Sequence, residues 1–168
     1  PNISMVEKPT WLTFTANTNG TAKLEGTPTN DNIGTFNVSI IVSDGLLDNT
    51  QSFQISVTNI NDKPVVNSQK TLTTAEETTI ALSLSDLNVT DVDNTYPTGF
   101  LLELGAGANY TLSGLNVTPS LNYNGVITVP ARVNDGQSVN NLSDWFNVSL
   151  TVTAVNDKPT MNGLESTT

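Results

Sequence analysis

Several acidic side chains in this sequence stand in turn-like segments where they could hold a cation. Asp91 and Asp93 are separated by a single residue, and Asp135 stands directly before Gly136. Alternate residues of an extended chain point to the same side, so the Asp91–Asp93 pair can direct two carboxylates at one point. Calcium takes about six to eight oxygen ligands from carboxylates, amides and backbone carbonyls. The chemistry that this spacing favours is therefore coordination of a hard divalent cation.

Further oxygen ligands stand in two copies of one tetrapeptide and in a pair of glutamates. The sequence Asn61-Asp62-Lys63-Pro64 recurs as Asn156-Asp157-Lys158-Pro159, and the glutamates are Glu76 and Glu77. Asp and Asn are also favoured in turns for backbone reasons alone. The alternative interpretation is therefore that the Asp and Asn side chains only shape solvated turns. For the glutamates, the alternative is an exposed charge on a strand.

The composition excludes most other chemistries. The chain has 168 residues, with 16 acidic and 6 basic side chains, a net charge of −10, and no histidine or cysteine. Nucleic acids and anionic membrane surfaces are poor partners for such a chain, because both bind clustered lysine and arginine. Without histidine and cysteine the chain lacks the ordinary general base and the soft-metal ligands. We therefore expect no enzyme. No apolar run approaches the roughly 20 residues needed to cross a bilayer, so we expect no membrane insertion.

An internal repeat supplies the framework for the candidate ligands. The two tetrapeptides begin at positions 61 and 156, so the period is 156 minus 61, or 95 residues. Upstream of each tetrapeptide lies a segment of alternating polarity, Ser52–Thr58 and Trp145–Thr153. Before each of these segments stands an Asp-Gly pair, at Asp44 and at Asp135. The same elements therefore occur twice in the same order.

The local periodicity is that of antiparallel strands. Residues 35–42 and 51–58 alternate apolar and polar side chains, and residues 125–133 and 146–155 repeat the pattern. Such alternation is typical of half-buried strands in a one-sided sheet, and Asn-Gly and Asp-Gly pairs mark turns between them. Residues 86–89 are expected to form a single turn at most. The predicted fold class is all-β, with tandem immunoglobulin-like sandwiches of Greek-key topology.

The repeat divides the chain into three parts. Residues 63–157 accommodate about seven strands, the number in an immunoglobulin-like sandwich, so we predict a complete domain there. The strands are expected near Leu72 and at residues 79–84, 99–104, 109–112, 115–118, 125–133 and 145–154. By the same measure, residues 1–62 form a domain that is incomplete at its N-terminus, and residues 158–168 begin a third repeat. An unpaired sheet edge favours aggregation, so we expect the first domain to be only marginally stable unless the missing strands are supplied.

The combination of motifs resembles tandem cadherin-like repeats, chiefly those of bacterial surface adhesins with repeats of this length. In the first domain, the segments at residues 9–14, 24–28 and 42–45 resemble the dystroglycan-type cadherin-like pattern. In the second domain, residues 76–78, 91–93, 122–125 and 133–136 are similar to the other common repeat of those arrays. The resemblance implies an extracellular or cell-surface location.

The resemblance also implies which residues would bind calcium (Ca2+). In the cadherin fold, a linker motif binds the ion together with an Asp-x-Asp loop and a strand-end Asp of the next domain. The implied junction site consists of Asn61, Asp62, Asp91, Asp93 and Asp135, with the backbone carbonyl of Lys63. Asp44 would belong to the equivalent site of the first domain. Asn156 and Asp157 would begin a further site, together with Glu76 or Glu77. The first linker aspartate of the family is Asn59 here and Ala154 in the second linker, so we expect less charge at each site.

We therefore expect a non-enzymatic, calcium-stiffened segment that extends or attaches an extracellular array. The expected partners are neighbouring repeats of the same chain and a cell-surface protein or glycan. Two alternatives stay open: a carbohydrate-binding accessory module of a polysaccharide-degrading enzyme, and a structural spacer without metal. A carbohydrate module would need exposed aromatic side chains. Tyr96, Tyr110 and Tyr123 are the expected candidates, because Trp11 and Trp145 lie in segments that predict packing in the core or at its edge.

Overall fold

The structure, a computed structural model, describes residues 2–159, and the chain divides into two compact units, residues 1–60 and 61–168. The sequence analysis placed this boundary after residue 62, whereas here residues 61 and 62 belong to the second unit. The predicted third repeat falls largely on residues 160–168, which lie outside the described residues. Within residues 2–159 the regular elements are strands and two short 3-10 turns, and no helix there could span a bilayer.

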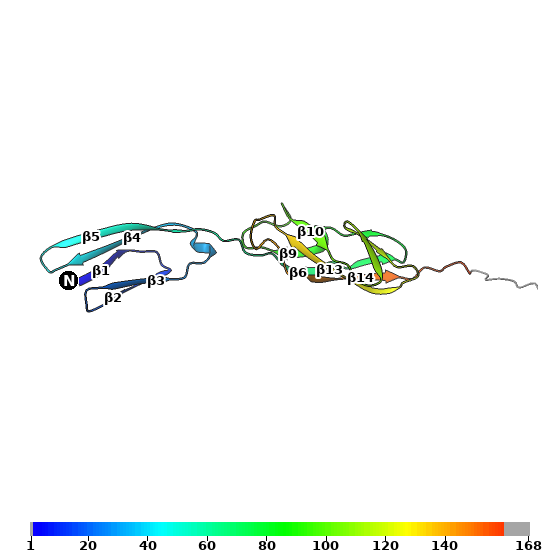
Figure 1. Ribbon diagram of the computed structural model, residues 1–168, viewed down its shortest axis with the longest axis horizontal. Coiled ribbons are helices and arrows are strands. Elements are labelled where there is room, and N and C mark those ends of the chain that lie inside the picture. The colour runs from blue at the N-terminus through cyan, green and yellow to red at the C-terminus, as the bar shows by residue number, and fades with distance from the viewer. Residues whose placement is uncertain (1, 160–168) are drawn as a thin grey trace, which may run out of the picture. The chain divides into compact units, whose positions relative to one another are not determined.

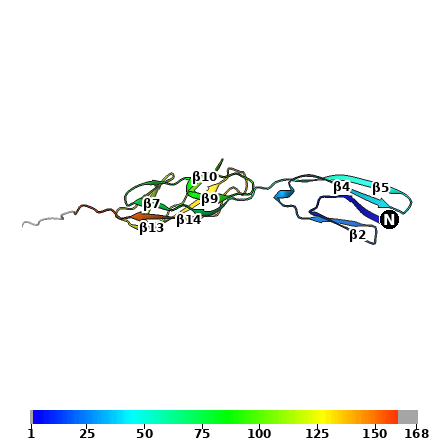
Figure 2. The same ribbon diagram turned by 180° about the vertical axis from the view of Figure 1, so that it is seen from behind.

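The first unit combines a three-stranded antiparallel sheet with a separate hairpin (Figures 1 and 2). The sheet has the order β1-β4-β5. The hairpin joins β2 and β3, and a short 3-10 turn, η1, precedes β4. The bounds are β1 Asn2–Glu7, β2 Leu12–Ala16, β3 Ala22–Gly26, η1 Asn30–Asn32, β4 Gly34–Ser43 and β5 Asp48–Val57. The alternating segments at residues 35–42 and 51–58 were correctly predicted as strands.

The first unit has a small core. Among its described residues, Leu12, Val38 and Ser39 are the ones that are buried. The indole of Trp11 packs edge-on against the ring of Phe36, with centroids 5.6 Å apart. A Cβ atom on residue 26 would lie 2.6 Å from the carbonyl oxygen of Trp11, so only glycine fits there without a backbone shift. Trp11 therefore packs inside this unit, as the sequence predicts.

The second unit contains nine strands and one 3-10 turn within the described residues (Figure 1). They form a four-stranded sheet of order β10-β13-β14-β7, a three-stranded sheet of order β11-β12-β8, and the pair β6-β9. The bounds are β6 Val65–Gln69, β7 Leu72–Ala75, β8 Ile80–Ala81, η2 Leu84–Asp86, β9 Leu87–Thr90, β10 Leu101–Leu104, β11 Tyr110–Ser113, β12 Asn116–Pro119, β13 Gly125–Asn134 and β14 Phe146–Thr153.

The core of the second unit joins these sheets into a sandwich. Every second residue of β13 and β14 is buried, and Val129 lies opposite Val148 in their antiparallel register. These side chains share one cluster with Val117 of β12 and Val89 of β9. Alternation with one buried face is the pattern of a sheet that packs against a second layer. The predicted all-β, immunoglobulin-like fold class is confirmed.

The strand β7 pairs with β14 in parallel, at the edge of the four-stranded sheet. Leu72 lies opposite Leu150, and Ala75 lies opposite Thr153. Just before β7, the side-chain amide of Gln69 donates to the carbonyl oxygen of Ser149 at 2.8 Å and accepts from its N–H at 2.6 Å. The side chain of Gln69 thereby extends the pairing of β7 along the edge of β14.

Two strands of the second unit were not predicted. The expectation of a single turn at residues 86–89 was wrong, because η2 ends at Asp86 and β9 begins at Leu87. The strand β6 was also absent from the predicted set. These two short strands pair with each other, and Val66 lies opposite Val89. Each is only four or five residues long, so its stability comes from a partner about 20 residues away rather than from local periodicity.

Candidate metal site

The linker segment Asn61–Lys63 is held against the second unit by the side chain of Asn61. Its Nδ2 donates hydrogen bonds to Asp135 Oδ2 at 2.9 Å and to the carbonyl oxygen of Val139 at 3.1 Å. The side-chain amide of Asn140 donates to the carbonyl oxygen of Asn61 at 2.7 Å. Since these partners all belong to the loop after β13, this loop fixes the path of the linker.

The loop that follows β9 reaches the same linker segment. Asp91 Oδ1 accepts hydrogen bonds from the N–H groups of Asp93 and Asn94, both at 2.8 Å, which closes a compact turn. Asp93 Oδ2 accepts from the N–H of Asp62 at 2.6 Å, and Asn94 Nδ2 donates to Asn61 Oδ1 at 3.1 Å. The resulting hydrogen-bond network connects the five residues predicted for the first site, through the side chains of Asn61, Asp91, Asp93 and Asp135 and through the backbone of Asp62.

Asp135 is the buried member of this network. Its Oδ1 accepts from the N–H of Gln137 at 2.9 Å, and its Oδ2 accepts from Asn61. The side-chain amide of Gln137 donates to Asn94 Oδ1 at 3.0 Å and so connects the two loops. The sequence analysis did not identify Asn94, Gln137 or Asn140. Asn94 directly follows the Asp-x-Asp motif, which was a usable signal, whereas the positions of Gln137 and Asn140 depend on the loop fold.

One oxygen atom of the network is buried without a hydrogen-bond donor. Asp91 Oδ2 is inaccessible to solvent and has no hydrogen-bond partner, although Oδ1 of the same carboxylate accepts two bonds. Burying a carboxylate oxygen without a donor is costly, because the charge loses its hydration. Such an atom in a native fold calls for an explanation, and a bound cation is one of the few available.

The donor set fits calcium in its chemistry, although the carboxylates are spread out. The network offers carboxylate, amide and backbone oxygens and no nitrogen or sulfur ligand, as a hard cation requires. Across residues 2–159, however, no three acidic side chains lie close enough together to hold a metal by themselves. A cation at this place would therefore need amide and carbonyl oxygens as well as the carboxylates.

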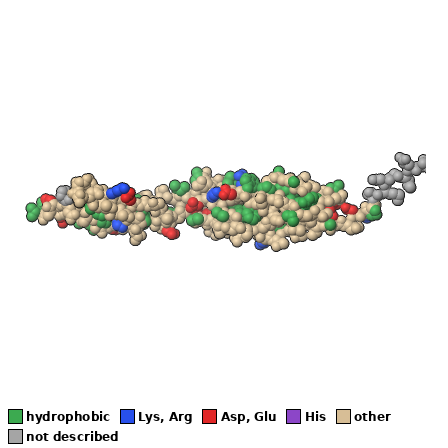
Figure 3. Space-filling model, turned by 90° about the horizontal axis from the view of Figure 1, so that it is seen from below, with side chains coloured by type: hydrophobic (Ala, Val, Ile, Leu, Met, Phe, Trp, Pro, Cys, Tyr) green, Lys and Arg blue, Asp and Glu red, His purple; other side chains and the backbone are tan. Residues whose placement is uncertain are grey.

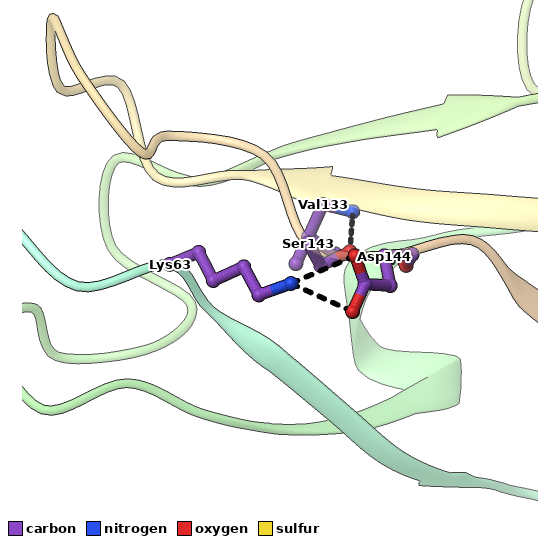
Figure 4. A network of polar contacts seen from close by, with 4 residues as sticks. All are labelled: Lys63, Val133, Ser143 and Asp144. Carbon is purple, nitrogen blue, oxygen red and sulfur yellow. Dashed lines mark hydrogen bonds and ion pairs between the residues drawn. The ribbon is translucent and has the colours of Figure 1, made fainter.

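The side chain of Lys63 is directed to another partner. Its ammonium group lies 2.8 Å from Asp144 Oδ1 and 2.7 Å from Asp144 Oδ2 (Figure 4). The neighbouring Ser143 hydroxyl accepts from the N–H of Val133 at 3.0 Å and donates to the backbone carbonyl of Asp144 (Figure 4). Both ion-pair partners are exposed. Only the backbone of Lys63 was predicted as a ligand, and the ion pair holds its side chain elsewhere.

The other predicted ligands of the second unit lie around the end of β14. Glu76 is buried, and its Oε1 accepts from the N–H of Val155. The side-chain amide of Asn122, oriented to suit its neighbours, donates to Asp157 Oδ2 at 2.9 Å and to Glu77 Oε1 at 3.0 Å. Asn156 Nδ2 donates to the carbonyl oxygen of Asp157 at 3.2 Å. These contacts gather a second set of oxygen ligands, and Figure 3 shows acidic side chains at both ends of this unit.

Asp44 has a structural role in the first unit. It follows β4, and its Oδ1 accepts hydrogen bonds from the N–H groups of Leu46 and Leu47, both at 2.9 Å. These bonds, that of Leu47 foremost, lower the pKa of the Asp44 carboxyl below its ordinary value of 3.8. The carboxylate therefore caps the turn between β4 and β5, as the turn alternative in the sequence analysis describes.

The aromatic side chains are arranged differently from the expectation. The hydroxyls of Tyr96 and Tyr110 donate to backbone carbonyls, and burial raises the pKa of both phenols. Tyr110 is buried, and Tyr96 and Tyr123 are partly buried, so the prediction that the tyrosines are the exposed aromatics was wrong. Trp145 is instead 50% exposed, with the guanidinium of Arg132 4.5 Å from its ring centroid.

Similar folds occur in cadherins. The structure of protocadherin gamma B2 extracellular cadherin domains 1–5 aligns with a TM-score of 0.54 and 14% identity over 92% of this chain and 32% of that one. Domains 1–2 of human protocadherin-24 align with a TM-score of 0.52 and 21% identity over 93% and 82%. At this identity the likeness shows the fold alone. An endo-fucoidan hydrolase of glycoside hydrolase family 107 aligns with a TM-score of only 0.37 and 22% identity over 92% of this chain, which spans 24% of that chain.

The family is shown by the sequence of the second unit. No protein of curated function matches the chain. Residues 61–151 match the family described as bacterial Ig domain, and this range includes the linker segment, both loops of the hydrogen-bond network and the whole of β13. The match covers more than half of the 168 residues. The chain therefore belongs to the bacterial Ig domain family, with a cadherin-like sandwich as its fold.

Proposed function

We propose that this chain is a calcium-binding, non-catalytic segment of an extracellular or cell-surface protein. The site is the hydrogen-bond network of Asn61, Asp62, Asp91, Asp93 and Asp135, with the backbone carbonyl of Lys63. A bound calcium ion would supply the positive charge that these oxygen atoms lack. The affinity expected for such an extracellular module is a Kd of about 10⁻⁴–10⁻³ M.

The observation that carries the proposal is the buried, donor-free Oδ2 atom of Asp91. It belongs to a carboxylate whose Oδ1 is already fixed by two backbone N–H groups, so the second oxygen has a defined position. The same turn places Asp93 against the N–H of Asp62, and Asn61 connects the linker to Asp135. Three chain segments thus meet at one place with oxygen ligands, which is the arrangement that a divalent cation would stabilise.

The test is thermal unfolding of the full chain in a chelator and in excess calcium. At a free calcium concentration of 100 times Kd, binding to the folded state alone stabilises it by about 2.7 kcal/mol. For a unit of this size that corresponds to a rise in Tm of roughly 10–20 °C. Amide hydrogen exchange in β13 and β14 assigns the transition to the second unit. Equal ionic strength in both solutions removes the general effect of salt.

The Asp91→Asn variant removes the proposed charged ligand and keeps the hydrogen bonds that hold the turn. An asparagine keeps an oxygen at the Oδ1 position for the two backbone N–H groups and replaces the charged Oδ2. We expect the calcium-dependent rise in Tm to fall to less than a third. The matched control is Asp86→Asn, because Asp86 accepts from the N–H of Ser83 at 2.8 Å in a similar turn outside the network. If wild type shows no rise in Tm, the chain is a spacer without metal, and the proposal is wrong.

The same proposal extends to the second oxygen set and to the role of the protein. Glu76, Glu77, Asn156 and Asp157 would begin a further calcium site at the end of β14. Calcium bound by Asn61–Lys63 would fix the linker to two loops of the second unit and shorten the free segment before it. The protein would then serve as an extension or adhesion segment, with neighbouring repeats and a cell-surface protein or glycan as partners. We also propose that the first unit is a cadherin-like repeat of the dystroglycan type.

A carbohydrate-binding role is the second candidate, and the exposure of Trp145 favours it. Trp145 is 50% exposed on the second unit. It lies beside Arg132, which forms an ion pair with Glu103 at 2.8 Å. Exposed indoles are suited to contact with sugar rings. A glycan array would test this candidate: binding that persists in chelator and disappears in Trp145→Ala would support it. Equal signals for wild type and Trp145→Ala would contradict it.

A further inference from the structure

The linker backbone is held in place on both sides of Lys63. Before it, the carbonyl oxygen of Asn61 accepts a hydrogen bond from the side-chain amide of Asn140 at 2.7 Å. After it, Pro64 is fully buried, and a proline restricts the preceding residue to extended conformations. The place of the Lys63 ammonium group therefore depends on the direction of the side chain, since the backbone has little freedom.

The carboxylates of the candidate metal site lie within reach of this ammonium group. Lys63 directly follows Asp62, whose N–H donates to Asp93 Oδ2 at 2.6 Å. Consecutive Cα atoms are only about 3.8 Å apart, and a lysine carries its charge at the end of a flexible four-carbon stem. The Lys63 side chain is therefore long enough to bring its charge to the Asp93 carboxylate. An ammonium group at that place would repel a divalent cation and occupy oxygen atoms that the cation needs.

In the structure the Lys63 side chain extends to Asp144 instead (Figure 4). Its ammonium group lies 2.8 Å from Asp144 Oδ1 and 2.7 Å from Oδ2, so both carboxylate oxygens accept from it. Lys63 is the basic residue of the linker segment Asn61–Lys63. The ion pair thus neutralises the basic side chain that stands nearest in sequence to the linker ligands.

The position of Asp144 is fixed by the buried Ser143. The N–H of Ser143 donates to the carbonyl oxygen of Val133 at 2.9 Å, and its hydroxyl accepts from the N–H of Val133 at 3.0 Å (Figure 4). The same hydroxyl donates to the carbonyl oxygen of Asp144 at 2.9 Å. Val133 is buried in β13, and Asp135 follows it by two residues. The end of β13 therefore positions both the buried carboxylate of the site and the carboxylate that binds Lys63.

We infer that Asp144 is a positioning residue, which holds the Lys63 ammonium group away from the candidate metal site and so leaves the carboxylates of that site to a divalent cation. The inference rests on the proposed calcium site and adds a residue that regulates it from outside the ligand set. Without Asp144, Lys63 becomes a competitor for calcium within the linker itself. The side chains of both partners are exposed, 50% for Lys63 and 87% for Asp144, so the pair has a moderate effect.

The experiment is calorimetric titration of the full chain with calcium at constant ionic strength. We expect Asp144→Asn to raise the Kd about three- to fivefold, the range that an exposed ion pair can supply. The double variant Asp144→Asn/Lys63→Met should return the Kd to within about twofold of wild type, because it removes the competing ammonium group as well. If the pair served only to anchor the linker, the double variant would bind as weakly as Asp144→Asn.

The matched control is Glu103→Gln, because Glu103 forms an ion pair with Arg132 at 2.8 Å in the same unit. This variant removes the same charge, but Arg132 also stacks over Trp145, 4.5 Å from the ring centroid, and is held there. The Kd of Glu103→Gln should therefore differ from that of wild type by less than about twofold. NMR of the calcium-free protein gives a second readout. The carboxyl carbon signal of Asp93 should shift in Asp144→Asn and return to its wild-type position in the double variant.

Two results would overturn the inference while the proposed function stands. The first is that wild type binds calcium and Asp144→Asn binds it with the same Kd. The second is that the double variant stays as weak as Asp144→Asn, since the pair would then act as an anchor. If wild type does not bind calcium, the proposed function is wrong and the inference falls with it. Because the Asp144 side chain is 87% exposed, the variants should fold like wild type, which similar Tm values in chelator would verify.

Discussion

The unequal packing of the two units predicts unequal costs for the same truncation at repeat-equivalent positions. Leu150 and Ile55 are 95 residues apart and lie on β14 and β5. Leu150 is 0% exposed and surrounded by the core of the second unit, whereas Ile55 is only partly buried. Replacing a buried leucine by alanine removes contacts and leaves a cavity, and costs about 3 kcal/mol or more. For the partly buried Ile55, we expect a cost of about 1 kcal/mol.

Native-state hydrogen exchange measures both costs in one protein. Slowly exchanging amides report the free energy of opening of the structural unit to which they belong. Leu150→Ala should lower this free energy in β13 and β14 by about 3 kcal/mol, equivalent to a fall in Tm of roughly 12 °C or more. Ile55→Ala should lower it in β4 by about a third as much. If Ile55→Ala costs as much as Leu150→Ala, the side of β5 is covered, and the comparison of the two units is refuted.

Three further perturbations have defined outcomes. Gly26→Ala should destabilise the first unit by more than about 1 kcal/mol, because the new Cβ would meet the backbone oxygen of Trp11; a change within error in hydrogen exchange would contradict this. The Asp44 carboxylate, whose pKa is lowered in the folded state, stabilises the first unit fully above pH 3.8, and this stabilisation is lost as the pH falls through the lower folded pKa. An NMR titration of the Asp44 carboxyl carbon that gives a pKa of 3.8 or above would contradict this prediction. Arg132→Ala should expose the indole of Trp145 and shift its fluorescence to longer wavelength, at a cost of about 0.5–1 kcal/mol; an unchanged spectrum would contradict the stacking.

The long strands could be predicted from the sequence because each has its own periodic signal. In β13 and β14 the buried residues alternate over eight to ten positions, and Thr and Val suit such strands. The strands β6 and β9 have four or five residues each and no comparable signal. Their pairing depends on the core that forms around them. The missed elements are therefore the ones whose stability comes from tertiary contacts.

The candidate site was predicted in part. The Asp-x-Asp spacing and the repeated tetrapeptide identified five residues that the hydrogen-bond network connects. The sequence did not indicate that Gln137 joins the two loops, because the position of its side chain is set by the loop after β13. The exposure of Trp145 was also missed, because the residue stands one position before β14, where the alternation of the strand does not decide whether a side chain faces the core or the solvent.

The parallel pairing of β7 with β14 has a mechanical consequence. The chain enters the second unit through β6, which leads directly into β7, and leaves it directly after β14, so a pulling force that reaches β7 draws β7 and β14 in opposite directions along their axes. In this geometry the hydrogen bonds between them share the load and must break together, whereas a hairpin opens one bond at a time. The two bonds between Gln69 and the backbone of Ser149 carry part of that load. The second unit is thus built to resist tension along the chain.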